Sequence, residues 1–394
     1  MAAYLDHAAS TPVRPTAVEA MLPFLREHHG NPSGSHASAR RARAALDDAR
    51  DVVAEVVGDV SPGDVVFTAG GTEADNLAVL GLHDRRGGTI VAAAAEHHAV
   101  LDPVLARDGC LVGVGADGAV DLDALAATLD RLDDVSLVSV MLVNNEVGAV
   151  SPIPAVADVV REHAPGAVVH TDAVQAPMWL DLRTHAEGAD LVSLSAHKLG
   201  GPKGVGALVV RSGASGALAP RTLGGGQERG RRGGTQNVAG IVAFAEALRA
   251  TDDERATAVP RLRAQRDRLV DGLRAAVPGL VETGVTSGPD GAPDAAVRAR
   301  RAAGIAHVCI PGISSESLLF LLDEQGICAS AAASCSSGAL EVSHVLAAMG
   351  VAPAHAAGSL RLSLGWCSTP ADVDAALAAI PPAVERLRAL EGAG

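Results

Sequence analysis

Seven short apolar runs alternate with stretches of helical periodicity between about residues 64 and 210 of the chain. They cover residues 64–69, 89–94, 110–115, 135–142, 167–171, 190–195 and 205–210. Several are apolar along nearly their whole length, as expected of strands that are covered on both faces. Strands that alternate with helices predict an α/β fold in which a mostly parallel, seven-stranded sheet lies between helices. The last run follows its predecessor too closely for a crossover helix, so we expect it to be antiparallel.

The part of the chain after residue 240 has a different character. Residues 241–277 have the periodicity of two or so long helices, which we expect to lead out of the sheet domain. Residues 282–304 are rich in Gly, Pro and charge and predict an exposed loop, after which a second, smaller α/β segment follows. A chain of 394 residues has room for a large domain and a smaller companion. Because 2% of the residues are aromatic, Ala, Val and Leu must fill the core.

The charge pattern of the chain argues against two classes of partner. The formal net charge is −14 at pH 7, whereas a nucleic-acid surface needs a clustered basic face. The arginine-rich run at 41–50 alternates in sign and predicts a solvated helix. We find no charge-free apolar stretch long enough to span a membrane, and no signal-peptide pattern at the start of the sequence. We therefore expect a cytoplasmic protein that binds neither nucleic acid directly nor membrane.

The cysteines do not form the pattern of a disulfide framework or of a metal site. They are Cys110, Cys309, Cys328, Cys335 and Cys367. An odd number at wide spacing, in a chain without a secretion signal, does not predict disulfides. No CxxC pair exists, and the paired histidines lack cysteines at zinc-finger spacing, so we expect no metal. One of the cysteines is a candidate reactive thiol.

The two lysines of the chain, Lys198 and Lys203, both lie in the run SLSAHKLGGPKG (193–204), and every other strong base is arginine. Arginine serves for surface charge, but it cannot lose a proton near neutral pH. A lysine retained in such a chain suggests an amine that becomes neutral and acts as a nucleophile. Two simpler explanations compete: the arginine bias is compositional, or a lysine beside glycines only caps a turn.

A glycine-rich turn connects the first predicted strand to an amphipathic helical pattern at Gly70, Gly71 and Thr72. Thr72, with Asp75 three residues later, has the pattern of a capping box. Free backbone N–H groups and the helix dipole favour an anion at such a place, and glycines allow its close approach. The turn is neither a P-loop nor a dinucleotide-binding fingerprint. An ordinary capped helix therefore remains an alternative to a phosphate site.

Polar residues follow the ends of three other predicted strands. They are Glu96, His97 and His98, then Asn144, Asn145 and Glu146, and finally Asp172. Open α/β sheets bind ligands at the carboxyl ends of their strands, although Asp172 by itself could cap the next helix and a single histidine is more often structural. What favours function is that an anion cradle, an acid, an amide, a histidine and Lys198 meet at adjacent strand ends. Pyridoxal 5′-phosphate needs an anion site, a Schiff-base lysine and an acid beside its pyridine nitrogen.

The motifs of the chain, taken in order, are those of a known family. They are YLDHAASTPVRP, GNPSGSH, VVFTAGGTEADNLAV, EHHAVLD, VNNEVGAV, HTDAVQ, SAHKLGGPKGVGAL, GGGQERGRRGGT, CSSGALEVSHVLAAMG and RLSLG. The chain thereby resembles the cysteine desulfurases, fold-type-I pyridoxal-phosphate enzymes of the class V aminotransferase group, nearly from end to end. The resemblance implies a large cofactor-binding domain at 15–255. It also implies a small domain, formed by 1–14 and 256–394, that carries Cys335 and Arg361.

The resemblance also implies a role for individual residues. Lys198 would form the Schiff base, Asp172 would pair with the pyridinium nitrogen, and His97 would stack on the ring and assist proton transfers. The cofactor phosphate would be held by Gly71, Thr72, Ser195 and His197. Asn145 and Gln175 would lie near the phenolic oxygen of the ring and the substrate. Thr235 would reach the phosphate of the other subunit, which implies a homodimer with shared active sites, while Lys203 would have a structural role.

Two further residues would act on the substrate, L-cysteine. Arg361 would bind its carboxylate in a bidentate pair, where lysine would be a poor replacement. Cys335 would attack its sulfur, although a free cysteine is more usually a buried structural thiol. Many relatives of the longer-loop type carry Ser-Gly-Ser-Ala before this cysteine, whereas this chain has Ala331–Ala332–Ala333–Ser334. Alanine in place of glycine restricts the backbone, which puts the mobility expected of the loop at 330–338 in doubt.

The implied reaction removes the sulfur of L-cysteine, with alanine and a Cys335 persulfide as products. An acceptor protein such as an iron–sulfur scaffold or a thiolation enzyme, or a thiol, would collect the sulfur. Iron–sulfur cluster assembly, tRNA thiolation, DNA sulfur modification and cofactor biosynthesis all use such enzymes. Within the same fold, an aminotransferase, a kynureninase-like lyase or a selenocysteine lyase remain alternatives. A catalytically silent protein that only docks sulfur-transfer partners is a further alternative, from a different class.

Overall fold

The central feature of the fold is a seven-stranded sheet with the strand order β2-β8-β7-β6-β5-β3-β4. The structure is a computed structural model that describes residues 2–214, 216–286, 293–331 and 343–391. The strands are β2 (Val65–Thr68), β3 (Thr89–Ala93), β4 (Cys110–Val112), β5 (Val135–Ser139), β6 (Val168–Asp172), β7 (Leu191–Ser195) and β8 (Gly206–Val210). Each coincides with one of the predicted apolar runs, although β6 extends one residue beyond its run to Asp172, and β8 is antiparallel to both β2 and β7, as expected. The prediction of a mostly parallel sheet is confirmed.

The sheet is buried on both faces because successive strand residues point into different hydrophobic clusters. Val66 and Leu208 face one cluster, together with residues of α3 (Gly71–Arg86) and α4 (His98–Leu105). Val65 and Val209, each one residue away, face a second cluster. That cluster includes α2 (Ala37–Val57), α5 (Leu122–Leu129), α6 (Ile153–His163) and α7 (Leu182–His185). Two apolar faces explain why the strand sequences are continuously apolar rather than alternating.

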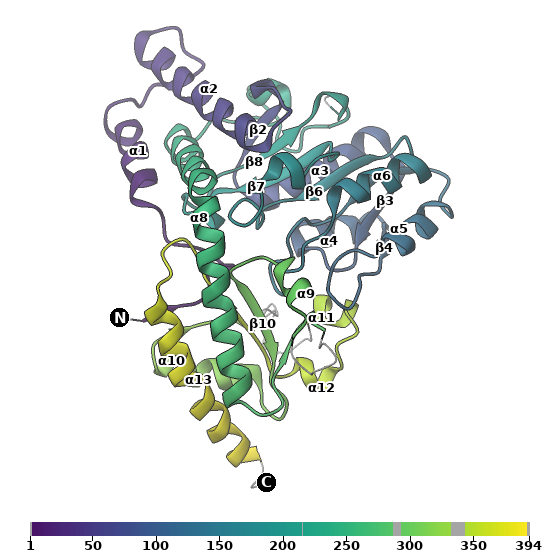
Figure 1. Ribbon diagram of the computed structural model, residues 1–394. Coiled ribbons are helices and arrows are strands. Elements are labelled where there is room, and N and C mark those ends of the chain that lie inside the picture. Colours follow the sequence, from purple (N-terminus) through teal and green to yellow (C-terminus); the bar gives the residue numbers. More distant parts are fainter. Residues whose placement is uncertain (1, 215, 287–292, 332–342, 392–394) are drawn as a thin grey trace.

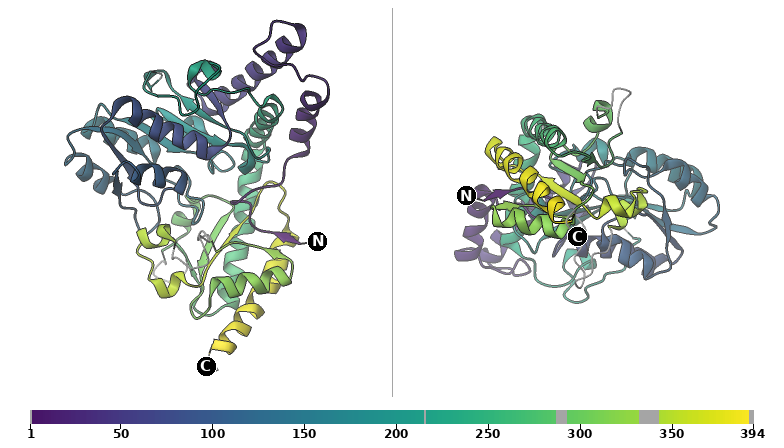
Figure 2. Two further views of the ribbon diagram at one scale, coloured as in Figure 1. Left: turned by 180° about the vertical axis from the view of Figure 1, so that it is seen from behind. Right: turned by 90° about the horizontal axis from the view of Figure 1, so that it is seen from below.

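A smaller group of elements lies at the other end of the molecule, and this part contains both the N-terminal and the C-terminal segment of the chain (Figures 1 and 2). It has an antiparallel sheet of order β12-β10-β9 and a parallel pair β1-β11. The strands are β1 (Ala3–Tyr4), β9 (Val281–Glu282), β10 (Ile305–Cys309), β11 (Ile327–Cys328) and β12 (Ser359–Ser363). Its helices are α9 (Ala295–Ala299), α10 (Ser315–Glu324), α11 (His344–Ala348), α12 (Pro353–Ala356) and α13 (Pro370–Glu391). Pairing with β11 places β1, at the N-terminal end, in this second group.

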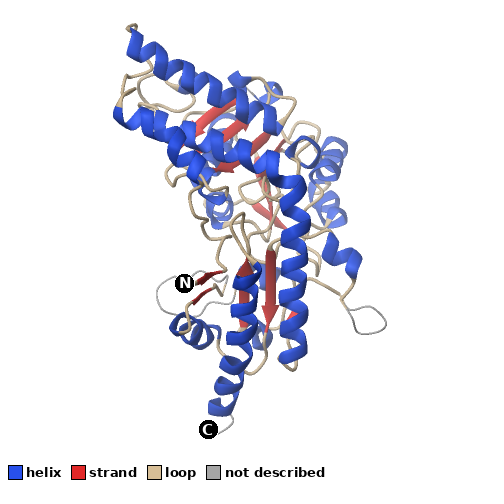
Figure 3. Cartoon of the chain, turned by 60° about the vertical axis from the view of Figure 1, so that its left-hand side comes forward, coloured by secondary structure: helices blue, strands red, loops and turns tan. Residues whose placement is uncertain are grey.

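One long helix, α8 (Val238–Ala276), connects the two groups of strands (Figures 1 and 3). The expectation of two or so helices over 241–277 is wrong, because the helix continues through Pro260. A proline inside a helix removes one backbone hydrogen bond, but α8 is held along its length by α1 (Pro15–Arg26), α2, α13 and β10. The expected domain boundary after residue 255 falls inside this helix. The division into domains of 15–255 and of 1–14 with 256–394 stays a prediction.

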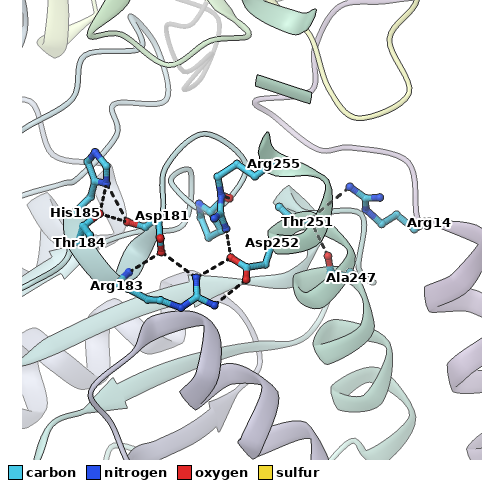
Figure 4. Close-up of polar contacts among 10 residues, drawn as sticks. Arg14, Asp181, Arg183, Thr184, His185, Ala247, Thr251, Asp252 and Arg255 are labelled. Carbon is cyan, nitrogen blue, oxygen red and sulfur yellow. Dashed lines mark hydrogen bonds and ion pairs between the residues drawn. The ribbon is translucent and has the colours of Figure 1, made fainter. Parts of the chain in front are cut away.

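Polar contacts fix the middle of α8 to the sheet domain, as Figure 4 shows. Asp252 receives two hydrogen bonds from the guanidinium of Arg183 on α7, at 3.2 and 2.8 Å, and a further one from Arg255. On the same helix Thr251 contacts Arg14, which also bonds Leu199 O at 3.1 Å. A bidentate guanidinium–carboxylate pair is a geometrically specific contact. It orients α8 against α7.

The described residues of the segment 282–304 form regular elements on both sides of 287–292, and the expectation that the segment contains an exposed loop stays a prediction. Its described residues include the second residue of β9 and helix α9, and Arg298 and Arg301 are buried there. Arg298 donates to Glu282 in a buried ion pair, and Arg301 donates to the carbonyl of Asp117 at 2.9 Å. Two of the arginines of this segment are therefore satisfied inside the protein, whereas Arg300 is exposed; residues 287–292 lie outside the described part of the chain. The arginine-rich run at 41–50 does form a helix, on which Arg41, Arg43, Asp47 and Asp48 are exposed. Arg50 is mostly buried and forms an ion pair with Glu228.

The membrane prediction can be compared with the helices directly. None of the helices in the described ranges combines the length and the apolar character needed to cross a bilayer.

Packing against α3 is expected to contribute strongly to stability. Leu82 is fully buried between α3 and the sheet, whereas Leu105 at the end of α4 is 51% exposed. Leu82→Ala should lower the free energy of unfolding by about 2–5 kcal/mol, because it removes buried methyl groups and leaves a cavity. Leu105→Ala should change it by less than about 0.5 kcal/mol. Denaturant unfolding of both variants tests this expectation; equal losses would contradict it.

Candidate active site

A pocket of about 220 Å³ opens at the carboxyl ends of the parallel strands. It is lined by Gly71, Thr72, Asp75, His97, Ala99, Met141, Asn145, Asp172, Val174, Gln175, Ser195, His197 and Lys198. These residues come from the start of α3, the start of α4, and the segments that follow β5, β6 and β7. The structure therefore brings together most of the residues that the sequence singles out. Arg361 contacts the same region from β12, whereas Thr235 is exposed and does not line the pocket of its own chain.

The N-terminus of α3 forms one wall of the pocket. The helix begins at Gly71 after Gly70, whose φ of 156° suits glycine. A Cβ atom on Gly71 would lie 2.7 Å from Cγ2 of Val174, so a larger residue would intrude on the neighbouring segment. The capping box expected for Thr72 and Asp75 is not formed, because the cap residue is Gly70, two residues before Thr72, and it has no side chain. The first-turn N–H groups therefore have no intrahelical acceptor and remain available to an anion.

Lys198 lies in a single turn of 3₁₀ helix, Ala196–Lys198, directly after β7. Its Nζ donates hydrogen bonds to the backbone carbonyls of Ala8, at 2.6 Å, and Ala9, at 2.9 Å. Burial and, to a lesser extent, the positive charge of Arg361 lower the pKa of Lys198 to about 8. The negative charge of Asp172 acts in the opposite direction. A substantial fraction of this amine is thus neutral slightly above neutral pH, which an arginine could not achieve.

Asp172 is the acid of the pocket, at the end of β6. Its Oδ1 accepts a hydrogen bond from the backbone N–H of Val174 at 2.9 Å. The pKa of Asp172 is raised to about 6. Burial raises it, and this hydrogen bond and the charge of Lys198 partly offset that effect. A cation bound beside this carboxylate would stabilise its ionised form.

Two further buried acids, Asp75 and Glu96, lie behind Asp172. Burial raises the pKa of each well above its usual value, and the charge of Asp172 raises both further. Glu96 accepts a hydrogen bond from Met141 N–H at 2.6 Å, and Asp75 Oδ1 lies 3.6 Å from Nε2 of His170. Buried carboxylates without a paired cation are costly. Burial and the charge of Asp172 therefore favour the neutral form of Asp75 and of Glu96.

His97 is the N-cap residue of α4. Its Nδ1 accepts a hydrogen bond from the backbone N–H of Ala99 at 3.1 Å. The surrounding protein and then the charge of Lys198 lower its pKa to about 4, so the ring is neutral. With Nδ1 as the acceptor, the proton is on Nε2. His197 is likewise neutral, because burial and Lys198 lower its pKa to about 4.

Arg361 is buried at the edge of the pocket on β12. Its Nη1 donates to the backbone carbonyl of Asn145 at 3.1 Å, and its Nη2 forms an ion pair with Asp6 at 2.7 Å. The third donor, Nε, is buried without a hydrogen-bond partner among the described residues. The guanidinium thus still has capacity for a carboxylate, as predicted for a substrate clamp.

The other sequence predictions have mixed outcomes. Asn144 is a structural residue, because its side chain bonds Ala95 O and the N–H groups of Glu146 and Val147. Gln175 donates to Ala8 O at 2.7 Å and lines the pocket. Cys335 lies outside the described residues. The described residues contain no group of metal-ligating side chains that could hold an ion.

Sequence reasoning missed the contribution of the N-terminal segment. Asp6 binds Arg361, Ala8 and Ala9 hold Lys198, and Ser10 Oγ lies 3.4 Å from Nδ1 of His197. No local pattern reveals these contacts, because they connect residues more than 180 positions apart. Asp75 was considered only as a cap. Because Asp75 stands between Glu73 and Asn76 in a polar first turn, no local pattern identifies it as a buried site residue.

The comparisons with known proteins agree with this geometry. Residues 3–376 match the family model of the aminotransferase class-V family. An IscS-like cysteine desulfurase of Mycobacterium tuberculosis is 45% identical, with 100% of this chain and 99% of that protein covered. A cysteine desulfurase of Cereibacter sphaeroides is 40% identical over 99% of this chain and 98% of that protein. A solved NifS-like protein superposes with a TM-score of 0.87 at 34% identity, covering 98% of this chain and all of that one.

The fold and the pocket thus define a class V aminotransferase-type protein. Within that class, the chain belongs to the cysteine desulfurase family. A solved structure of SspA in complex with cysteine is also similar, with a TM-score of 0.75 and 29% identity over 92% of this chain and 98% of that one.

The lowered pKa of Lys198 predicts its reactivity. A small amine-reactive reagent labels only neutral amines, so in cofactor-free protein the labelling of Lys198 should rise with pH through a midpoint near 8. Arg361→Gln removes a nearby positive charge and should shift the midpoint to higher pH. Mass spectrometry of the peptide that contains Lys198 measures both. A midpoint near 10.4, typical of an unperturbed lysine, would contradict the assignment.

Proposed function

We propose that the chain is a pyridoxal-phosphate-dependent cysteine desulfurase that converts L-cysteine to L-alanine and transfers the sulfur onward from Cys335. The observation that carries the proposal is a buried lysine amine of lowered pKa in one pocket with a free helix N-terminus and a buried acid. The family of the chain supports the same activity.

The chemistry of the pocket fits the proposed cofactor. A phosphate group is matched by the N-terminus of α3, where Gly71 leaves room for close approach, and by the side chains of Thr72, Ser195 and His197. A protonated pyridine nitrogen is matched by the carboxylate of Asp172. Among the groups that shift the pKa of Asp172, Lys198 is the cation. Lys198 would hold the cofactor, and Asn145 and Gln175 would lie beside the ring. His97 would cover the face of the ring.

The residues of the chain would divide the reaction among them. When bound, the cofactor supplies an electron sink for the carbon skeleton of the substrate. Arg361 binds the substrate carboxylate, and the neutral amine of Lys198 removes the Cα proton and later returns a proton. His97, neutral and with a proton on Nε2, can give or accept a proton on the substrate side. Near pH 8 about half of the Lys198 amines are neutral. The amine can then both accept and return a proton, because its pKa is close to the pH of the solution.

Cys335 would take the sulfur itself. Its thiolate attacks Sγ of the substrate and forms an S–S bond, the Cβ–S bond breaks, and the electron pair of that bond remains on the carbon skeleton. Protonation of that skeleton gives alanine, and the sulfur stays on Cys335 as a persulfide. Support comes from the described residues on both sides of 332–342. Ser330 pairs with the backbone of Arg361 at 2.7 Å, and Ser343 donates to Glu146 close to the same arginine.

The partners follow from this chemistry. The substrate is L-cysteine, and the persulfide requires an acceptor protein or thiol, such as an iron–sulfur scaffold or a thiolation enzyme. The exposed Thr235 would reach the phosphate in the second subunit of a homodimer, which would explain why it does not line the pocket of its own chain. The proposed location is the cytoplasm.

The two lysines offer a matched pair of substitutions. Lys198→Arg keeps a positive charge but cannot become neutral, so alanine formation from L-cysteine should fall by about 10²–10⁴-fold or more. Lys203→Arg, at an exposed position three residues after Gly200, should leave the rate unchanged. Comparable losses in both variants would contradict the assigned roles.

Cysteine substitutions separate a desulfurase from its relatives. Cys335→Ala should abolish the formation of sulfide and alanine in the presence of a reductant, while the visible absorbance of bound cofactor is retained. Cys328→Ala, on the half-buried strand β11, is the control and should retain activity. Alanine formation that survives Cys335→Ala would favour another reaction of the same fold, and selenocysteine as a second substrate would identify a selenocysteine lyase.

Mixed dimers test whether Thr235 acts across subunits. Thr235→Ala should weaken cofactor binding by about tenfold, through the loss of one hydrogen bond to a charged group. A hybrid of one Lys198→Ala subunit and one Thr235→Ala subunit should contain one intact site with wild-type cofactor affinity. If Thr235 serves its own subunit, the hybrid will show only the weakened affinity. A monomer in sedimentation experiments would refute the shared site.

A further inference from the structure

Asp6 forms an ion pair with the guanidinium of Arg361, the group that is proposed to bind the substrate carboxylate. The inference drawn from this contact rests on the proposed function. The Arg361 side chain is 5% exposed, and a buried guanidinium without a counter-charge is costly. Among the described residues, Asp6 is the acid that forms an ion pair with it, through a contact of 2.7 Å between Nη2 and Oδ1. Asp6 therefore neutralises the arginine when no substrate is present.

The contact between the two residues leaves part of the guanidinium unused. A single ion-pair contact joins Asp6 to Nη2, and Nη1 is bonded to Asn145 O. Nε, next to Nη2 on the same edge of the fork, has no hydrogen-bond partner in the part of the chain that the structure describes. A carboxylate that binds both Nε and Nη2 would satisfy this buried donor as well, and two parallel hydrogen bonds are stronger than one. The arginine is thus better matched to a second carboxylate than to Asp6.

The main chain at Asp6 is fixed, but its side chain has a route away from the arginine. Asp6 pairs with Ser363 in a parallel bridge, and its carbonyl accepts hydrogen bonds from Tyr4 Oη and from the N–H groups of Ala9 and Ser10. The carboxylate itself is 23% exposed, which gives it contact with water. Rotation of one side chain into solvent is therefore sufficient to release the guanidinium.

We propose that Asp6 is a specificity-determining residue whose carboxylate holds Arg361 in the empty site and is displaced from it by the α-carboxylate of the incoming amino acid. A ligand without a carboxylate cannot replace Asp6, so the exchange selects for amino acids over their uncharged derivatives. The competition also makes the apparent affinity for the substrate weaker than the affinity of a free Arg361.

Asp6→Asn tests the displacement, because asparagine keeps the shape and a hydrogen-bond acceptor but loses the charge. The ligand is 3-mercaptopropionate, which has the carboxylate and thiol of cysteine but no amine to react with the cofactor. Calorimetry on the holoenzyme should show about tenfold tighter binding to Asp6→Asn than to the wild type, the difference between a charged and a neutral competitor. The KM for L-cysteine should fall while kcat is unchanged.

Thermal unfolding provides a readout that does not depend on turnover. Asp6→Asn leaves the buried guanidinium without its counter-charge, so the melting temperature should fall. Addition of 3-mercaptopropionate should raise it by more than in the wild type, because the ligand binds the folded state more tightly. Asp6→Glu, which restores the charge, should bind like the wild type. Asp374→Asn on α13, which breaks an exposed ion pair with Arg268 on α8, is the matched control and should leave all values unchanged.

The outcomes separate this inference from the proposed function. Equal or weaker binding in Asp6→Asn would overturn the displacement and leave Arg361 as the carboxylate site. If Asp6→Asn does not fold, Asp6→Ser is measured in its place with the same expectations. Absence of binding to the wild type and to all variants would instead overturn Arg361 as the carboxylate site, and the role of Asp6 with it.

Discussion

Coverage of the central sheet on both faces is the constraint on which the rest of the structure depends. Neighbouring strand residues such as Val65 and Val66 are buried in separate clusters, so both faces of the sheet are largely apolar. Apart from His170, which bonds Ser139 and Ser193 within the sheet, polar side chains gather where the strands end. At the carboxyl ends they do so: the ends of β5, β6 and β7 and the starts of α3 and α4 together line a single pocket. The position of the candidate active site is a consequence of how the core is built.

The charges of the pocket depend on one another because they are buried. Lys198, Asp172, Asp75 and Glu96 share a small volume, and three acids cannot all be ionised beside one amine. Burial lowers the pKa of the amine and raises those of the acids, which leaves a reactive lysine and one acid poised to carry charge. Arg361 contributes from the second group of strands by lowering the pKa of Lys198. Asp6 in turn moderates that arginine through their ion pair. The small β12 strand and the N-terminal segment are thus electrostatic parts of a site built mainly on the large sheet.

Much of the fold and site could be predicted from the sequence because the relevant signals are local. Continuous apolar runs located all seven strands of the sheet, and the short distance between the last two identified the antiparallel strand. Residues at the strand ends, among them His97, Asp172 and Lys198, were identified because strand ends follow directly from the runs. The errors have physical causes. The helical pattern at 241–277 suggested two or so helices, whereas packing along α8 supports one helix through Pro260. In 282–304, which was expected to contain an exposed loop, Arg298 is ion-paired and Arg301 is hydrogen-bonded inside the protein. The role of Thr235 and the domain division remain predictions.

The sequence by itself determined the α/β class, the pattern of the sheet, the family and the identity of the reactive lysine, because each is carried by periodicity, composition or a short motif. The tertiary structure decided which residues meet. It placed the carbonyls of Ala8 and Ala9 on Lys198, Asp6 on Arg361 and the neutral Asp75 behind Asp172. These contacts join segments that are far apart in the chain, or they depend on burial. No local pattern encodes either, because a contact between distant segments and the pKa of a buried group are set by the packing of the whole chain.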